Sequence, residues 1–127
     1  MSTSAQYAAT PKTEVAQIST ANTARDGTGT VATVYTAGAN GSRIDDLTII
    51  ATGTTTAGMV RLFISNGTIT RLWREIAVSA ITPSATVSPF SSLLGNLALV
   101  LQSGWSLRAS THNAETFNVL VTRAGDF

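Results

Sequence analysis

His112 and Glu115 are the only residues whose types and spacing suggest acid–base chemistry, and His112 is the sole histidine. A spacing of three brings two side chains to one face of a helix but not to one face of a strand. One interpretation is general acid–base catalysis. The other is a polar turn in which His112 and Asn113 cap backbone groups, and the sequence favours this second interpretation.

The remaining motifs give weak support to catalysis or to metal binding. Asp26-Gly27-Thr28-Gly29 holds the residue types of an aspartic-protease motif in the wrong order, with no second copy for a shared-proton dyad. Asp45-Asp46 could offer oxygen ligands to calcium, but calcium needs six or more of them. A glycosidase would have to use Glu75 and Glu115 across a cleft. We therefore predict no catalytic residue, no cofactor and no metal, and we expect that the protein is not an enzyme.

Composition narrows the possible partners. The chain has 127 residues, a net charge of +1 and no cysteine. A charge so close to zero argues against a non-specific nucleic-acid binder. The sequence also contains no run of about 18 apolar residues, the length that is needed to span a membrane. Disulfides and thiolate chemistry are excluded because cysteine is absent. We expect neither nucleic acid nor a membrane as a partner.

The polar residues are typical of a protein that works inside an assembly. The sequence has 21 Thr and 13 Ser, whereas charged residues make up only 12%. Seven of the eight basic residues are Arg, the cation that interfaces tolerate better than Lys. A surface of hydroxyl groups with few charges repels neighbouring proteins weakly, so the composition favours a structural or binding role.

Short apolar runs separated by turn signals predict a single all-β domain. About eight strands in one domain predict an antiparallel β-sandwich, jelly-roll-like, over residues 13–127. Pro83 and Pro89 bracket a loop or a short edge strand at 84–88. The expected strands are 14–20, 30–36, 43–52, 59–65, 68–78, 97–102, 105–110 and 117–122, with a bulge near Asp45-Asp46.

The clearest hairpin is predicted around Asn66-Gly67, as a two-residue turn between the runs 59–65 and 68–78. The faces of these strands mix apolar and charged residues, so a bulge or a buried Arg must reconcile them. Basic and aromatic residues interleave here, a pattern that favours a protein interface over single-stranded nucleic acid. The predicted assembly contacts of this hairpin are Arg61, Arg71, Trp73 and Arg74.

Residues 1–12 are small and polar and predict an N-terminal arm that becomes ordered on binding, with Pro11 and Lys12 as further contact residues. Trp105, next to Gly104, is interpreted as a core residue, with a sugar-stacking platform as the alternative.

Three stretches resemble a family of small virion proteins of tailed phages and prophages that is usually grouped with head genes. They are Ile18–Gly29, Leu72-Trp73-Arg74-Glu75 and Ser103–Val119, and the similarity extends from Ile18 through Phe127. The last stretch is the most specific of the three because it is long and rich in unusual residues.

This resemblance implies a capsid decoration (cement) protein that binds the head shell as a homotrimer and stabilises it. Its partner would then be the major capsid protein, and the protein would be made in the host cytoplasm and located on the capsid surface of the virion. The alternative is a tail or spike component with a host-glycan-binding role, for which Trp73, Trp105 and the Asn/Thr-rich loops are the motivating features.

Overall fold

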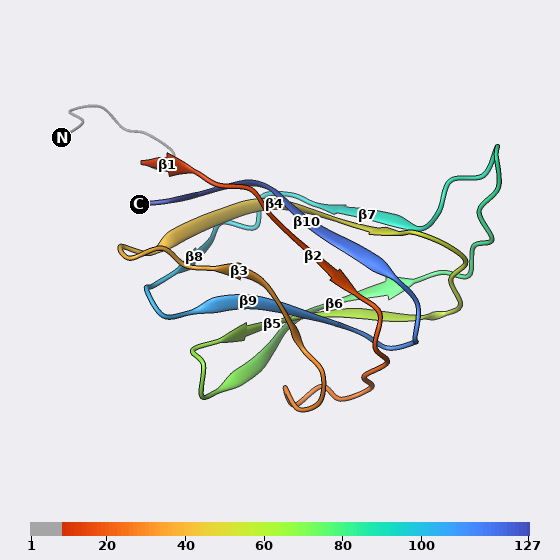
Figure 1. Cartoon of the computed structure of the whole chain (residues 1–127), viewed down its shortest axis with the longest axis horizontal. Coiled ribbons are helices and arrows are strands. Elements are labelled where there is room, and N and C mark those ends of the chain that lie inside the picture. Colours follow the sequence, from red (N-terminus) through yellow and green to blue (C-terminus); the bar gives the residue numbers. More distant parts are fainter. Residues whose placement is uncertain (1–8) are drawn as a thin grey trace.

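The computed structural model describes residues 9–127 and consists of antiparallel β-strands joined by loops (Figure 1). No helix in this part of the chain is long and apolar enough to cross a membrane. The strands are β1 (Thr10–Pro11), β2 (Glu14–Ile18), β3 (Ala32–Thr36), β4 (Ser42–Ala51), β5 (Gly58–Ser65), β6 (Thr70–Val78), β7 (Ser91–Leu94), β8 (Leu99–Leu101), β9 (Ser106–Thr111) and β10 (Phe117–Asp126).

Six strands form one sheet, which we call sheet A. Its centre is the long pair β10 and β4, and β1 and β2 lie end to end along the free side of β10. Strands β7 and β8 lie end to end along the free side of β4. The other four strands form sheet B, in the order β3-β9-β5-β6. The two sheets pack as a sandwich, which confirms the predicted fold class.

The strand pairs are nested as in a long hairpin that has been rolled up. The outermost pair is β2 with β10, followed inward by β3 with β9, β4 with β7 and β8, and β5 with β6. Two further pairings, β10 with β4 and β9 with β5, close the roll into two sheets. This nesting gives the eight rows of strands of a jelly roll.

The core lies between the inner faces of the two sheets. It includes Ile44, Leu47 and Ile49 from β4, and Val119 and Val121 from β10, all fully buried. Alternate residues of a strand point to opposite faces, so each of these runs buries every second side chain. The alternation breaks near Asp46, where β10 and β4 change register, as the predicted bulge required.

Two local predictions, on the hairpin turn and on the N-terminal arm, need correction. The turn between β5 and β6 contains four residues, because Asn66 Oδ1 accepts hydrogen bonds from the backbone N–H groups of both Thr68 and Ile69. Residues 84–88 form a loop, which was one of the two predicted alternatives, and an edge strand that was not predicted begins at Ser91. Thr10–Pro11 pairs with Asp126 and Gly125, so the described end of the predicted arm belongs to sheet A; residues 1–8 lie outside the described residues.

Candidate functional site: the outer faces of the two sheets

The segment 19–31, between β2 and β3, covers the outer face of sheet B. Arg61 and Phe63 alternate along β5 with the core residues Val60 and Leu62, so they point away from the core. Both are nevertheless buried, with exposed fractions of 1% and 0%. The backbone N–H of Asn22 donates to the carbonyl of Thr111, which ties the covering segment to β9.

Arg61 is the centre of a polar cluster beneath this segment. Its Nε lies 2.7 Å from Oε2 of Glu75 on the neighbouring strand, and its Nη1 donates to the carbonyl of Asn22. Arg25, from the covering segment, places its own Nε 2.7 Å from the same Glu75 oxygen. Hydrogen bonds from Arg25 and Arg61 hold the pKa of Glu75 below its ordinary value. One carboxylate thus joins the covering segment to sheet B.

His112 contributes an acceptor to this cluster. Nη2 of Arg61 lies 3.2 Å from Nδ1 of His112, and a guanidinium can only donate. Nδ1 therefore accepts, and the neutral ring carries its proton on Nε2. Glu115 instead accepts hydrogen bonds from the backbone N–H and the hydroxyl of Thr56, both at 2.8 Å. His112 and Glu115 therefore have different partners and serve two separate structural roles.

Asn22 holds the covering segment in its folded shape. Its side chain is buried; the amide group donates to the carbonyls of Thr28 and Thr30, and Oδ1 accepts from the N–H of Ala24. Gly27 has a φ of +88°, and a Cβ there would lie 2.5 Å from the carbonyl oxygen of Thr70. The segment therefore combines a buried amide with a glycine that allows close approach to β6.

We expect Gly27→Ala to detach the tip of this segment from β6. The substitution combines a φ that L-residues rarely adopt with a backbone clash at Thr70. Limited proteolysis should then cut the chain within 19–31 faster than in the parent protein. Gly67→Ala is the matched control, because Gly67 has a φ of +93° but no atom within 4 Å of the place where an added methyl group would lie. Equal cleavage of the two variants would contradict the close packing at Gly27.

Two of the predicted hairpin contacts are structural residues. Arg61 is buried and hydrogen-bonded within its own chain, so the free protein does not present it as an exposed contact. The requirement for a buried Arg or a bulge is confirmed, since β5 and β6 also shift register after Leu62. Trp73 packs against the core, with the Arg74 guanidinium 4.8 Å from its ring centre. Arg71 and Arg74 are exposed on β6, which is an edge strand of sheet B, and remain available as contacts.

The predicted contact at Lys12 is also engaged within the chain. Its ammonium donates to the carbonyl of Thr36 at 2.8 Å, lies 3.5 Å from Asp126, and stands over the ring of Tyr35. Burial disfavours the charge of Asp126, yet hydrogen bonds from Ser42 and Tyr35, together with Lys12, hold the pKa of this carboxyl below its ordinary value. Pro11 has an exposed side chain beside Gly125.

The acidic pair Asp45-Asp46 holds a loop of its own chain. Asp45 is buried, contacts Arg43 and accepts from the backbone N–H of Ala98, while Asp46 accepts from the N–H of Asn96. These two hydrogen bonds support backbone with positive φ, which is 47° at Ala98 and 54° at Asn96. Within residues 9–127 no group of three or more His, Cys, Asp or Glu side chains is placed to hold a metal ion.

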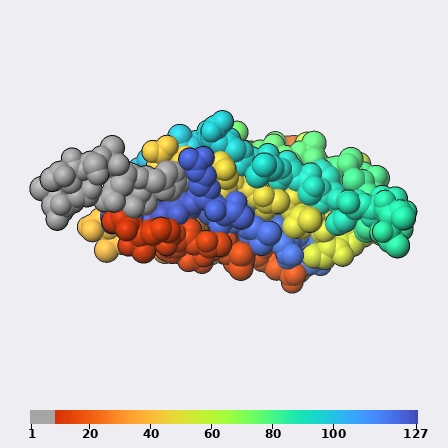
Figure 2. All heavy atoms as spheres, turned by 90° about the horizontal axis from the view of Figure 1, so that it is seen from above, coloured from red at the N-terminus to blue at the C-terminus, as the bar shows by residue number. Residues whose placement is uncertain are grey.

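The outer face of sheet A carries a row of three apolar residues and one threonine that sequence reasoning missed. Val15, Leu120, Thr48 and Leu93 occupy successive positions across β2, β10, β4 and β7, because each is the register partner of the next. Val15 is 64% exposed and Leu93 is 71% exposed. Figure 2 views this face, on which red β2, blue β10, yellow β4 and cyan β7 lie side by side. We call these four residues the sheet A row.

The sheet A row departs from the usual pattern of a sandwich. The outer face of an antiparallel sheet normally carries polar residues, and exposed apolar residues that form a contiguous patch mark interaction sites. Val100, on β8 of the same sheet, adds another apolar side chain that is 62% exposed. Trp105, in contrast, packs partly buried against the core, in agreement with its interpretation as a core residue.

Comparison of the chain with protein-family models gives no match, and comparison with curated proteins gives none either. The function must therefore be argued from the two outer faces.

Proposed function

We propose that this protein is a non-enzymatic structural protein of a phage virion that decorates and stabilises the head shell as an oligomer, most simply a homotrimer. The exposed sheet A row is the observation that carries the proposal. A side chain such as Leu93, 71% exposed at the edge of a rigid sheet, gains stability only when another surface covers it. The major capsid protein is the proposed partner.

The low charge of the molecule supports the same role. Only 12% of the residues are charged, so a lattice of copies meets little electrostatic repulsion. Each contact can be weak, because many simultaneous contacts on one particle add up to firm attachment. The exposed Arg71 and Arg74, on the free edge of sheet B, offer bidentate donors to a second neighbour.

The direct test adds purified protein to tailed-phage heads assembled without it and measures binding and resistance to heat. We expect bound protein and a higher temperature of head disruption. Leu93→Asp should weaken binding roughly tenfold or more, because a buried anion would replace an apolar contact. Val87→Asp is the matched control, since Val87 is 46% exposed but lies in the loop 84–88, away from the sheet A row.

Two outcomes would contradict the proposal. One is the absence of binding and of any change in heat resistance. The other is an equal loss of binding in both Asp variants, which would show that the sheet A row is not the contact surface.

A further inference from the structure

The edge of sheet A formed by β7 and β8 lacks the features that normally keep an edge strand from pairing with another chain. Such features are charged side chains, prolines and bulges. Strand β6, the outer edge of sheet B, has two of them: it exposes Arg71, Arg74 and Glu75, and its register with β5 is shifted. Residues 91–101, in contrast, contain no charge and no proline, and both β7 and β8 pair with β4 without a register shift. This edge can therefore accept a further strand.

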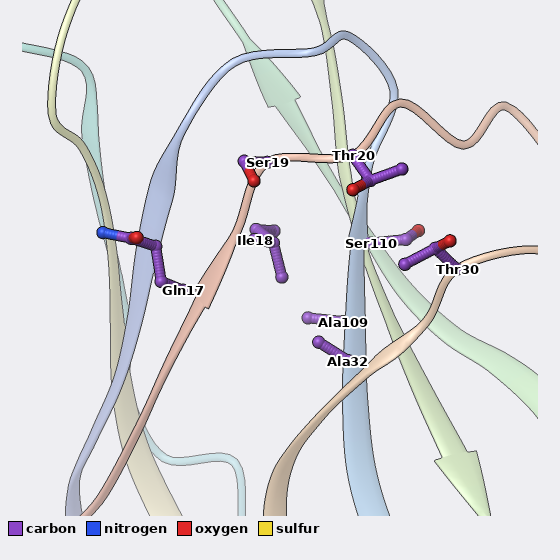
Figure 3. Close-up of a pocket in the computed structure, with 8 residues that line it drawn as sticks. All are labelled: Gln17, Ile18, Ser19, Thr20, Thr30, Ala32, Ala109 and Ser110. Atoms are coloured by element: carbon purple, nitrogen blue, oxygen red, sulfur yellow. The ribbon is translucent and has the colours of Figure 1, made fainter.

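The opposite edge of sheet A, formed by β2, carries side chains that match those of β7. Figure 2 shows red β2 and cyan β7 along opposite borders of the outer face. Val15 and Leu93, the two ends of the sheet A row, are 64% and 71% exposed. The next row on this face begins at Gln17 and ends at Ser91. Figure 3 shows Gln17 on the other side of β2 from the core residue Ile18. One row thus ends in apolar side chains at both edges, and the other ends in polar side chains.

A third row, at the far end of sheet A, also ends in apolar side chains. It connects Pro11 on β1 with Val100 on β8 through β10 and β4. Pro11 is exposed, and Val100 is 62% exposed. Every pair of neighbouring strands in this sheet is antiparallel, so β2 and β7 run in opposite directions. A second copy placed beside β7 in the same orientation therefore presents its β2 as an antiparallel neighbour.

We propose that copies of this chain meet head to tail through sheet A, with β2 of one copy adding to β7 of the next. Val15 then lies opposite Leu93 of the next copy, and Gln17 lies opposite Ser91. Pairing of two β7 strands with each other would leave Val15 uncovered, whereas the head-to-tail contact covers both ends of the row. This contact rests on the proposed oligomer and specifies it, because a head-to-tail contact can close into a ring of three copies and a two-fold contact stops at a dimer.

The contact is weak in the free protein. Strand β2 has five residues and β7 has four, so the ladder between copies is short. Stable interfaces usually bury more than about 1,000 Å², and ring closure together with attachment to a shell adds the strength that one short ladder lacks. A strand added at the edge extends the sheet sideways, so the outer face and its sheet A row stay available to the shell.

Disulfide trapping in the free protein tests the arrangement, because the chain contains no cysteine. Val15→Cys and Leu93→Cys are prepared as separate proteins and oxidised at high concentration, each alone and as an equimolar mixture. Residues opposite each other in an antiparallel pair have Cα atoms about 4.5–5.5 Å apart, a separation that a disulfide spans. We expect the mixed dimer to form about tenfold faster than either homodimer, because only this pair of thiols is held together.

The mixture of Val15→Cys with Val87→Cys is the matched control, since Val87 is 46% exposed but lies in the loop 84–88. Its dimer should form at the slow rate of random collision. Faster linking of Leu93→Cys to itself would indicate two-fold pairing of β7, and equal rates for all combinations would indicate that no specific contact exists. Either result overturns the proposal. No heads are present in this experiment, so its outcome is independent of shell binding, which the decoration assay measures separately.

Discussion

Replacing Asn22 with alanine is expected to destabilise the protein by about 3 kcal/mol, because a buried polar group left without its partner costs roughly 1–3 kcal/mol. The side chain satisfies the carbonyls of Thr28 and Thr30 and the N–H of Ala24 in a buried position. Its removal leaves these groups to find water, which requires the segment 19–31 to lift from sheet B. The midpoint of thermal unfolding should fall by roughly 10 °C.

Thr23→Ala is the matched control for this measurement, since Thr23 is an exposed neighbour in the same segment. Its unfolding midpoint should remain within a degree or two of the parent value, because exposed substitutions usually change stability by less than about 0.5 kcal/mol. If the two variants unfold at the same temperature, Asn22 does not hold the covering segment in place.

The second large effect is expected at Glu75. Replacing Glu75 with the neutral residue glutamine should lower the free energy of unfolding more than replacing its partner Arg61 with methionine. Glu75→Gln leaves the guanidinium of Arg61, 1% exposed, buried without a counter-charge. Arg61→Met removes the buried charge itself, and the side chain of Glu75 is 27% exposed, so its carboxylate can turn toward water. Chemical denaturation of the two variants gives the comparison, and a more stable Glu75→Gln variant would contradict this account of the cluster.

Glu75 should also contribute to acid sensitivity. Because Arg25 and Arg61 lower its pKa in the folded state, the unfolded chain binds a proton at this site more readily than the folded chain does. The stabilising contribution is therefore complete above the ordinary carboxyl pKa of about 4.3 and is lost as the pH falls through the lower folded value. The stability of Glu75→Gln should depend less on pH in this acid range than that of the parent.

Thr23→Ala provides the comparison for the pH profile, since it changes an exposed residue without removing a titratable group. Its profile should follow that of the parent protein. Parallel profiles for the parent and Glu75→Gln would show that the ion pairs of Glu75 do not contribute to acid sensitivity.

The sequence was sufficient to predict the jelly-roll sandwich because local signals agree along most of the chain. Residues 59–65 alternate apolar and other side chains, as a strand with one face on the core requires. Strand β7 was missed because Pro83 and Pro89 drew attention to residues 84–88, predicted as a loop or a short edge strand. Those residues form a loop, and the chain re-enters sheet A only after Phe90, whose ring is buried in the core.

The two outer faces were harder to predict because each depends on contacts between distant segments. The residue type and position of Arg61 are typical of an exposed interface residue. It is buried because the segment 19–31 packs over it. That segment has no periodicity that would reveal where it packs. The sheet A row consists of three single apolar residues and one threonine on four strands, and it becomes visible only when the register of those strands is known.

Thiol accessibility on assembled particles tests the central claim most directly, because the chain contains no cysteine and one introduced thiol reports on one position. Leu93→Cys and, as control, Val87→Cys would be labelled with a maleimide, first in the free protein and then on decorated heads. Both thiols should react readily in the free protein, since both parent side chains are exposed. On heads, we expect the thiol at position 93 to be protected and the thiol at position 87 to stay reactive. Rapid labelling at position 93 on fully decorated heads would contradict the assignment of the sheet A row as the shell-binding surface.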